Sequence, residues 1–167
     1  MKGEPFETRR LTQAELAEQV ITVSHRVQAQ YAWDAGAAIG GYLKALREGR
    51  LVGRACLKCR RTLIPPRMFC EQCFRPTDEW VDLADSGTVA TFSICHVSWD
   101  MRPLSTPEIP AVIDIDGASP GMGILHKLGE VEPEDVAAGM RVRAVWRPPD
   151  EREGSILDIR YFAPAGS

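Results

Sequence analysis

The chain has 167 residues, of which 44% are hydrophobic and 26% charged, a composition typical of a soluble globular protein with one ordinary domain or two small ones. Its net charge of −3 is unevenly distributed, because residues 40–76 carry nine Lys or Arg against two acidic residues, a local net of +7. The N-terminal stretch lacks the apolar core of a signal peptide, and no segment is long enough to span a membrane. We therefore expect a cytoplasmic protein with one basic segment in an otherwise acidic chain.

An N-terminal amphipathic helix is predicted from about Thr12 to Gln30. Thr12 and Glu15 have the spacing of a capping box, in which each side chain accepts a hydrogen bond from the backbone amide of the other residue. Apolar residues then repeat at intervals of three and four and form one stripe: Leu16, Val20, Val23 and Val27. We expect this stripe to pack on the body of this chain or on another subunit.

A second helix is predicted from Ala35 to Arg47, with Asp34 as its N-cap and Gly49 at its end. The segment contains three glycines, each of which costs about 1 kcal/mol relative to alanine inside a helix: Gly36, Gly40 and Gly41. Either the close approach of another backbone or a frayed first turn would explain them.

Two C-x-x-C pairs separated by ten residues are the strongest signal in the chain: Cys56 with Cys59, and Cys70 with Cys73. Each pair can turn two thiolates inward, and two pairs supply the four sulfur ligands of a tetrahedral zinc site. Disulfides are rare in the cytosol, and a redox-active dithiol uses one pair rather than two. Four thiolates leave no vacant position for water, so the sequence predicts a structural Zn²⁺ rather than a catalytic one.

Two interpretations of the basic charge in residues 40–76 stay open. One is an anionic partner, either nucleic acid or the phosphates of a nucleotide-like cofactor. The other is local, because four thiolates on a divalent ion make a doubly negative centre that nearby cations would offset. The cations in question are Arg54, Lys58, Arg60 and Arg61.

From Glu79 onward the pattern changes to short strands with one apolar face. The predicted strands are Trp80–Ala84, Gly87–Val97, Ala111–Ile115, Gly123–Leu128, Arg141–Arg147 and Ser155–Phe162. A short helical turn is predicted at Pro133–Val136, and in the last strand Leu157, Ile159 and Tyr161 are expected to face the core. The fold class is therefore α+β but mainly β, with N-terminal helices, a four-cysteine zinc ribbon and a C-terminal OB-fold β-barrel, and with a β-sandwich as the alternative to the barrel.

The order of these motifs resembles the DUF35 family, whose members are zinc-ribbon and OB-fold proteins of acyl-CoA metabolism. The resemblance covers about residues 33–164 and is carried by the segments Gly41–Arg54, Cys56–Cys73, Gly87–Val89, Gly121–Gly129 and Arg160–Pro164. With this resemblance the chain divides into a helical extension (1–32), a helix plus zinc ribbon (33–77) and an OB-fold domain (78–164).

The resemblance implies a subunit that is not catalytic by itself. Family members pair with thiolase-fold enzymes, or with thiolase-like aldolases or hotdog-fold hydratases, and help to form the acyl-CoA site. The cysteine-rich segment is most similar to the thiolase-associated branch, which includes proteins that serve the degradation of aromatic or other unusual acyl-CoA compounds. We therefore expect a hetero-oligomer with a thiolase-fold catalytic subunit, with no membrane contact.

Candidate chemistry in the sequence agrees with an accessory role. Cys95 and His96 are neighbours on a predicted strand and would point to opposite faces, so they cannot form a nucleophile–base pair within it. The sequence has no nucleophile elbow, Walker loop or dinucleotide fingerprint. CoA or acyl-CoA would bind at a site shared with the partner. The side chains expected to contact it are Arg54, Arg61, Arg67, His126 and Lys127, although His126 could instead be a surface or a satisfied core histidine.

Two other functions are alternatives to an accessory subunit. A nucleic-acid-binding OB-fold protein would need a basic groove interleaved with aromatic residues. The barrel half is acidic instead, and its aromatic residues Trp99, Trp146, Tyr161 and Phe162 are expected at least partly in the core. A free-standing acyl-CoA carrier would bind CoA tightly without any partner.

Overall fold

A computed structural model describes residues 10–19 and 27–166, and its contacts divide the chain into two units, Met1–Trp33 and Asp34–Ser167. In the first unit, α1 (Gln13–Gln19) begins with the predicted capping box: the Thr12 amide donates to Glu15 Oε2 at 2.9 Å, and the Glu15 amide donates to Thr12 Oγ1 at 3.3 Å. None of the helices among these described residues is long and apolar enough to cross a membrane.

The first helix was predicted to reach Gln30, and this prediction is wrong at its C-terminal end. Residues 27–30 have no regular secondary structure, and residues 20–26, with Val20 and Val23, lie outside the described part of the chain. Leu16 and Val27 of the apolar stripe are exposed. A helix gains most of its stability by burying an apolar face, and the exposed Val27 gives residues 27–30 no such contribution.

The second helix, α2 (Gly36–Arg47), begins one residue later than predicted, and its N-cap is Ala35 rather than Asp34. Asp34 Oδ1 still accepts a hydrogen bond from the Gly36 amide at 2.6 Å. Gly49 follows its end with φ +76°, a conformation that favours glycine. A Cβ added at Gly41 would lie 2.6 Å from the Trp80 ring, whereas one at Gly40 would meet nothing within 4 Å. The close neighbour of Gly41 is therefore an indole side chain rather than a backbone.

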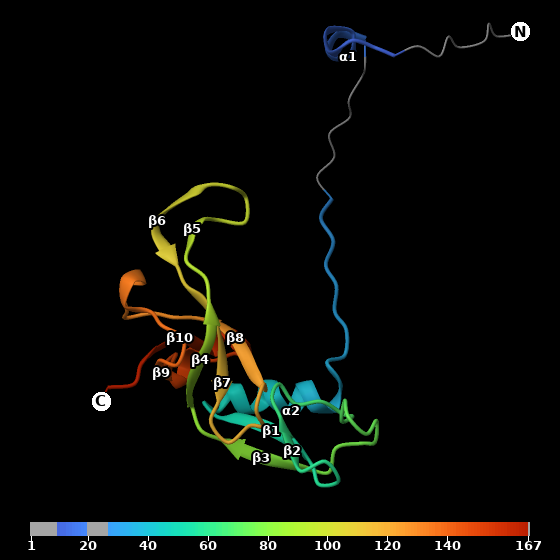
Figure 1. The fold of residues 1–167 in the computed structure, drawn as a ribbon. Coiled ribbons are helices and arrows are strands. Elements are labelled where there is room, and N and C mark those ends of the chain that lie inside the picture. The colour runs from blue at the N-terminus through green and yellow to red at the C-terminus, as the bar shows by residue number, and fades with distance from the viewer. Residues whose placement is uncertain (1–9, 20–26, 167) are drawn as a thin grey trace, which may run out of the picture. The chain divides into compact units, whose positions relative to one another are not determined.

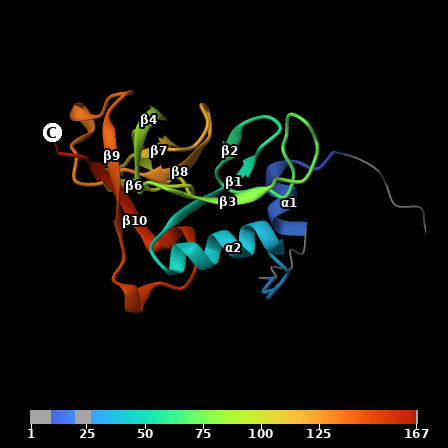
Figure 2. The ribbon, with the colours of Figure 1, turned by 90° about the horizontal axis from the view of Figure 1, so that it is seen from below.

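The ribbon sheet contains three antiparallel strands in the order β2-β1-β3. They are β1 (Leu51–Cys56), β2 (Arg61–Leu63) and β3 (Glu79–Leu83). The strand predicted at Trp80–Ala84 was expected to belong to the barrel, but as β3 it pairs with β1 instead. The chain returns from the second cysteine pair beside β1, where the Asp78 amide donates to the Ala55 carbonyl oxygen at 2.7 Å. Helix α2 packs against β1 (Figure 2).

The second sheet has five antiparallel strands in the order β10-β9-β4-β7-β8 (Figure 1). They are β4 (Ser86–Phe92), β7 (Pro110–Ile115), β8 (Gly123–Lys127), β9 (Arg141–Trp146) and β10 (Ile159–Pro164). Its two edges meet at one isolated parallel bridge between Leu128 and Phe162, so the sheet curls toward a barrel without a continuous ladder at the seam. The predicted helical turn is the 3₁₀ helix η1 (Pro133–Asp135) between β8 and β9, and a second one, η2 (Pro149–Glu151), follows β9.

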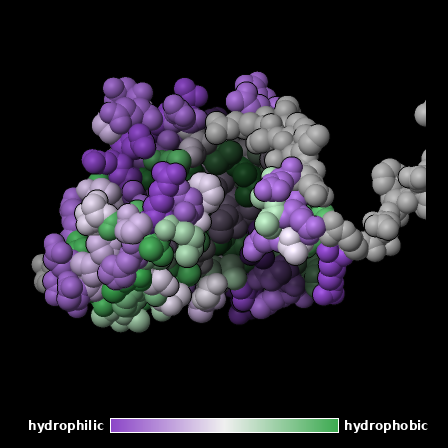
Figure 3. Space-filling model, turned by 90° about the horizontal axis from the view of Figure 1, so that it is seen from above, coloured by the Kyte–Doolittle hydropathy of each residue, from purple (hydrophilic) through white to green (hydrophobic). Residues whose placement is uncertain are grey.

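The strand predicted over Gly87–Val97 is broken into two. After β4 ends at Phe92, β5 (Cys95–Val97) pairs with β6 (Pro103–Glu108), a strand that the sequence did not predict because its prolines mask the pattern. The two strands form a protruding hairpin, and Trp99, expected at least partly in the core, is 96% exposed near its tip. Seen from the side of this hairpin, the surface mixes hydrophobic and polar side chains (Figure 3).

The strand predicted over Ser155–Phe162 begins instead as the 3₁₀ helix η3 (Ile156–Asp158). Leu157, expected to face the core, is exposed, whereas Asp158 is buried. Ser155 and Asp158 form a capping box, and this local hydrogen bonding overrides the alternating strand pattern. A register shift between Ile159 and Tyr161 then turns Phe162 fully inward.

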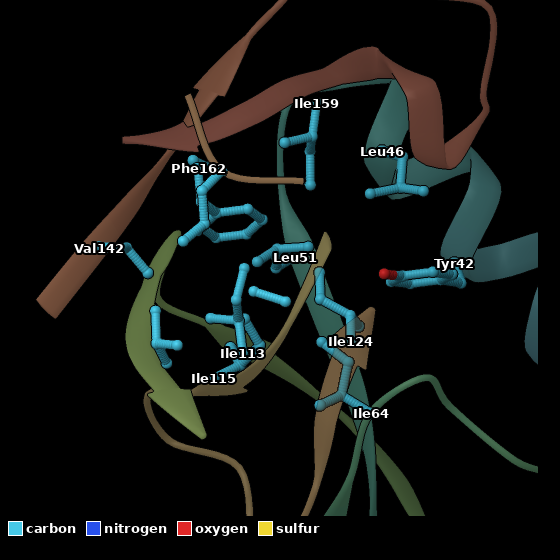
Figure 4. Close-up of a cluster of buried hydrophobic side chains, with 14 of the residues drawn as sticks. Tyr42, Leu46, Leu51, Ile64, Ile113, Ile115, Ile124, Val142, Ile159 and Phe162 are labelled. Atoms are coloured by element: carbon cyan, nitrogen blue, oxygen red, sulfur yellow. The ribbon is translucent and has the colours of Figure 1, made fainter. Parts of the chain in front are cut away.

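One hydrophobic core joins α2, the ribbon and the barrel (Figure 4). Leu46 comes from α2 and Leu51 from β1, and both pack in the same cluster as Ile113 of β7 and Phe162 of β10. All four are at most 1% exposed. The cysteine pairs are therefore attached to the barrel through a shared core rather than through a flexible linker.

Candidate metal centre and barrel groove

The structure brings the four predicted zinc ligands together at the tip of the ribbon. Their sulfur atoms all lie within 4.8 Å of one another, and Cys56 Sγ and Cys73 Sγ are 3.6 Å apart. Four sulfurs that each lie about 2.3 Å from a tetrahedral zinc ion are about 3.8 Å from one another. The spacing and the all-sulfur donor set therefore fit one structural zinc ion.

Backbone and neighbouring sulfur atoms set the acidity of these thiols in opposite directions. The backbone amides of Cys73 and Gln72 lower the pKa of the Cys70 thiol. The Cys73 sulfur, followed by burial, raises the pKa of the Cys59 thiol. Four thiolates cannot crowd together unless a cation neutralises them, so this cluster is chemically suited to a divalent ion.

Polar side chains tie the two cysteine turns to each other. Arg54 donates to the Thr77 carbonyl oxygen at 2.6 Å and to Thr77 Oγ1 at 3.0 Å, and Thr77 Oγ1 donates to the Arg67 carbonyl oxygen at 2.8 Å. Arg61 forms an ion pair of 2.8 Å with Glu71, which lies between Cys70 and Cys73. Two of the arginines predicted to contact CoA are thus engaged within the ribbon.

The five predicted CoA contacts do not come together in one site. Arg54 and Arg61 lie on β1 and β2, and Arg67 is exposed on the loop after β2. His126 and Lys127 lie on β8 and line a groove of the barrel whose lining includes none of these arginines.

The barrel groove has a volume of about 530 Å³ and combines apolar with cationic side chains. Leu125, Leu157 and Tyr161 provide much of its apolar lining, and Lys127, Arg147 and Arg160 provide the charge. Such a combination suits a ligand that carries both an apolar chain and anionic groups.

Individual contacts show how the groove residues are held. Arg147 Nε donates to the Leu157 carbonyl oxygen at 2.8 Å, and the Arg160 guanidinium lies 5.5 Å from the centre of the Tyr161 ring. His126 is 9% exposed, and its Nε2 lies 3.3 Å from the Ile156 carbonyl oxygen. In the sequence, Arg147 and Arg160 appear only as charged residues of two predicted strands. Their place in the groove depends on the meeting of β8 with β10, which local sequence does not reveal.

Comparisons with known protein families match both parts of the second unit. The family model "ChsH2, rubredoxin-like zinc ribbon domain" matches residues 43–79, and "ChsH2, C-terminal OB-fold domain" matches residues 80–147. These matches confirm the predicted fold class of a mainly β chain with a zinc ribbon and an OB-fold domain. The domain boundaries given above for residues 1–32, 33–77 and 78–164 stay a prediction.

Two curated relatives differ in how much of their length the chain covers. A "DUF35 domain-containing scaffold protein" of Methanocaldococcus jannaschii is 34% identical over 98 residues, which are 58% of this chain and 67% of the relative. A "probable enoyl-CoA hydratase alpha subunit" of Thermomonospora curvata is 25% identical over 124 residues, which are 74% of this chain. The chain spans only 36% of the hydratase subunit.

Two solved structures share the fold. A DUF35 protein of unknown function from Sulfolobus solfataricus has a TM-score of 0.60 at 20% identity, over 78% of this chain and 87% of that one. The "Ltp2-ChsH2(DUF35) aldolase" has a TM-score of 0.57 at 21% identity, over 81% of this chain and 98% of the matched chain. At this level of identity both matches support the fold alone.

Proposed function

The chain belongs to the DUF35 family, and from that premise we propose that it is a non-catalytic subunit of a thiolase-type acyl-CoA complex. It would stabilise the catalytic subunit and help to form the acyl-CoA site. The scaffold role named for the Methanocaldococcus relative supports an accessory function, as does the hydratase subunit named for the second relative. We favour a thiolase-fold partner because the cysteine-rich segment is most similar to the thiolase-associated branch of the family. A thiolase-like aldolase and an acyl-CoA hydratase are the alternative partners.

In this proposal Cys56, Cys59, Cys70 and Cys73 hold a structural zinc ion. The ion neutralises the thiolates and fixes the two cysteine turns, and with four sulfur ligands it has no open position for a substrate. The chain's part in the reaction is then to bind and position, while the partner supplies the reactive groups.

The barrel groove is the main structural support for the proposed contact with acyl-CoA. CoA has phosphate groups at one end and a long pantetheine arm, and the groove offers Lys127, Arg147 and Arg160 beside an apolar lining. His126 and Lys127 line this groove and remain proposed contacts for CoA. Arg67 lies outside the groove, and Arg54 and Arg61 are engaged within the ribbon.

The test uses the chain in complex with a thiolase-fold catalytic subunit that copurifies with it. Arg160→Glu should weaken the affinity of the complex for CoA by about tenfold, because an attractive charge becomes a repulsive one. The matched control is Arg143→Glu, which makes the same charge change on β9 at a residue outside the groove lining. Calorimetric titration with CoA measures both affinities.

Two results would contradict the proposal. Equal affinities for CoA in the two variants would remove the groove from the acyl-CoA site. A stable and active catalytic subunit that never copurifies with this chain would remove the accessory role altogether.

A further inference from the structure

We propose that the outer surface of the two cysteine turns is a docking site for an acidic, apolar segment of the catalytic subunit, an inference that rests on the proposed function. This knuckle surface consists of Leu57, Phe69 and Phe74 together with Lys58, Arg60 and Arg67. It lies on the ribbon and shares no residue with the barrel groove.

The knuckle surface exposes large apolar side chains at the place where the metal ligands converge. Leu57, Phe69 and Phe74 are 60%, 58% and 82% exposed, and each is the direct neighbour of a cysteine of the cluster. Leu57 follows Cys56 and Phe74 follows Cys73, the two cysteines whose sulfur atoms are 3.6 Å apart. Apolar residues gathered on an exposed surface mark a site of protein contact more often than scattered ones do.

The backbone at this surface supports the same conclusion. Arg60 and Phe74 occupy equivalent positions, each directly after the second cysteine of its pair, and both have φ +55°. Glycine adopts this left-handed conformation readily, whereas a bulky residue in it is strained. An 82% exposed phenylalanine contributes little to packing within the chain. The same φ at both equivalent positions indicates that each cysteine turn requires this conformation. A glycine would adopt it without strain, so an exposed phenylalanine at Phe74 supports a role in binding.

The charge of the surface identifies the chemistry of its partner. Among the residues that the structure describes, Arg61 is paired with Glu71 and Arg75 with Asp78, but no ion pair is formed by Lys58, Arg60 or Arg67. All three are exposed. A partner segment with carboxylates between apolar side chains would neutralise these cations and cover the phenylalanines.

A protein segment fits this surface better than a nucleic acid does. Leu57 offers no ring for a base to stack on, and the three unpaired cations would neutralise few phosphates. The chain as a whole carries a net charge of −3, which would repel a polyanion outside the knuckle surface.

The experiment measures the affinity of the zinc-loaded full chain for its purified thiolase-fold catalytic subunit. Phe74→Gly relieves the backbone strain and removes the apolar anchor, so it should weaken binding by about tenfold or more while the thermal midpoint of the chain stays the same or rises. A purely structural role for Phe74 would instead lower the midpoint and leave the affinity unchanged. The triple variant Lys58→Glu, Arg60→Glu, Arg67→Glu should also weaken binding, and its affinity should depend less on salt than that of the wild type.

Arg102→Glu, on the β5–β6 hairpin, is the control charge change, and zinc content is measured for every variant. Wild-type affinity in both Phe74→Gly and the triple variant would refute the knuckle surface and leave the proposed function standing. A wild-type chain that does not bind the catalytic subunit would refute the proposed function, and this inference with it. A third result would assign the surface to nucleic acid and overturn the proposal. In it, the wild type binds a single-stranded oligonucleotide tightly, the triple variant does not, and the triple variant still binds the catalytic subunit with wild-type affinity.

Discussion

Replacing Asp158 with asparagine should destabilise the chain by about 2–3 kcal/mol. Asp158 Oδ1 accepts a hydrogen bond from the Glu153 amide at 3.0 Å, and Oδ2 accepts from the amides of Gly154 and Ser155 at 2.8 and 3.0 Å. An asparagine keeps only one acceptor oxygen, so it loses at least one bond and turns its own N–H₂ toward a donor. Hydrogen bonds to a charged group are worth about 1.5–3 kcal/mol each, and the remaining ones weaken when the charge is removed.

The stability lost in Asp158→Asn should also depend on pH, which gives a second way to test this prediction. Burial raises the pKa of the Asp158 carboxyl, but the three backbone amides outweigh burial and hold the pKa below its ordinary value. A carboxyl with a lowered folded-state pKa contributes stability above its unfolded pKa and loses that contribution as the pH falls through the folded one. The stability difference between wild type and Asp158→Asn should therefore be constant from about pH 8 to 5 and shrink below about pH 4.

Urea unfolding at each pH measures the free energy of unfolding of both proteins, and taking their difference cancels any loss of zinc that affects both alike. Asp150→Asn, an exposed change on η2, is the control and should have almost no effect. A difference below about 0.5 kcal/mol at pH 7, the range of ordinary surface substitutions, would refute the reasoning. Because Ile156 and Leu157 line the barrel groove, we also expect Asp158→Asn to weaken CoA binding by the complex.

Three further perturbations test the ribbon and the core. Gly40→Ala should stabilise the chain by up to about 1 kcal/mol in urea unfolding. Gly41→Ala should destabilise it, because the added Cβ would collide with the Trp80 ring. Equal effects of the two substitutions would contradict the packing described for α2. Cys70→Ser, or a strong chelator, should release the metal measured by elemental analysis and lower the thermal midpoint, and an unchanged midpoint would argue against structural zinc. Phe162→Ala should destabilise the chain by about 3–5 kcal/mol, and a loss below about 1 kcal/mol would mean that the ribbon and the barrel do not share one core.

Local patterns in the sequence were sufficient wherever a structure depends on near neighbours. The capping box at Thr12, the end of α2 at Gly49 and the strands around Ile113 and Val142 follow from side-chain spacing alone. The cysteine pairs belong to the same class, since each pair closes within four residues and the structure brings the two pairs together.

Predictions failed where a distant contact or a competing local one decides the structure. Trp80 lies in the ribbon sheet because β3 pairs with β1, which strand propensity cannot show. Asp158 is buried because three backbone amides reach it, against the alternation that placed it outside. Arg160 joins Lys127 in the groove only because the edges of the curled sheet meet. Such long-range register is absent from any short window of sequence.

We propose that this chain shapes an acyl-CoA site without performing chemistry itself. The most direct measurement is the turnover of acyl-CoA by the isolated, zinc-loaded chain beside that of its complex with the catalytic subunit. We expect no turnover above the blank for the isolated chain and activity from the complex. Turnover by the isolated chain at about 1 s⁻¹ or faster, within the range of ordinary enzymes, would contradict the account.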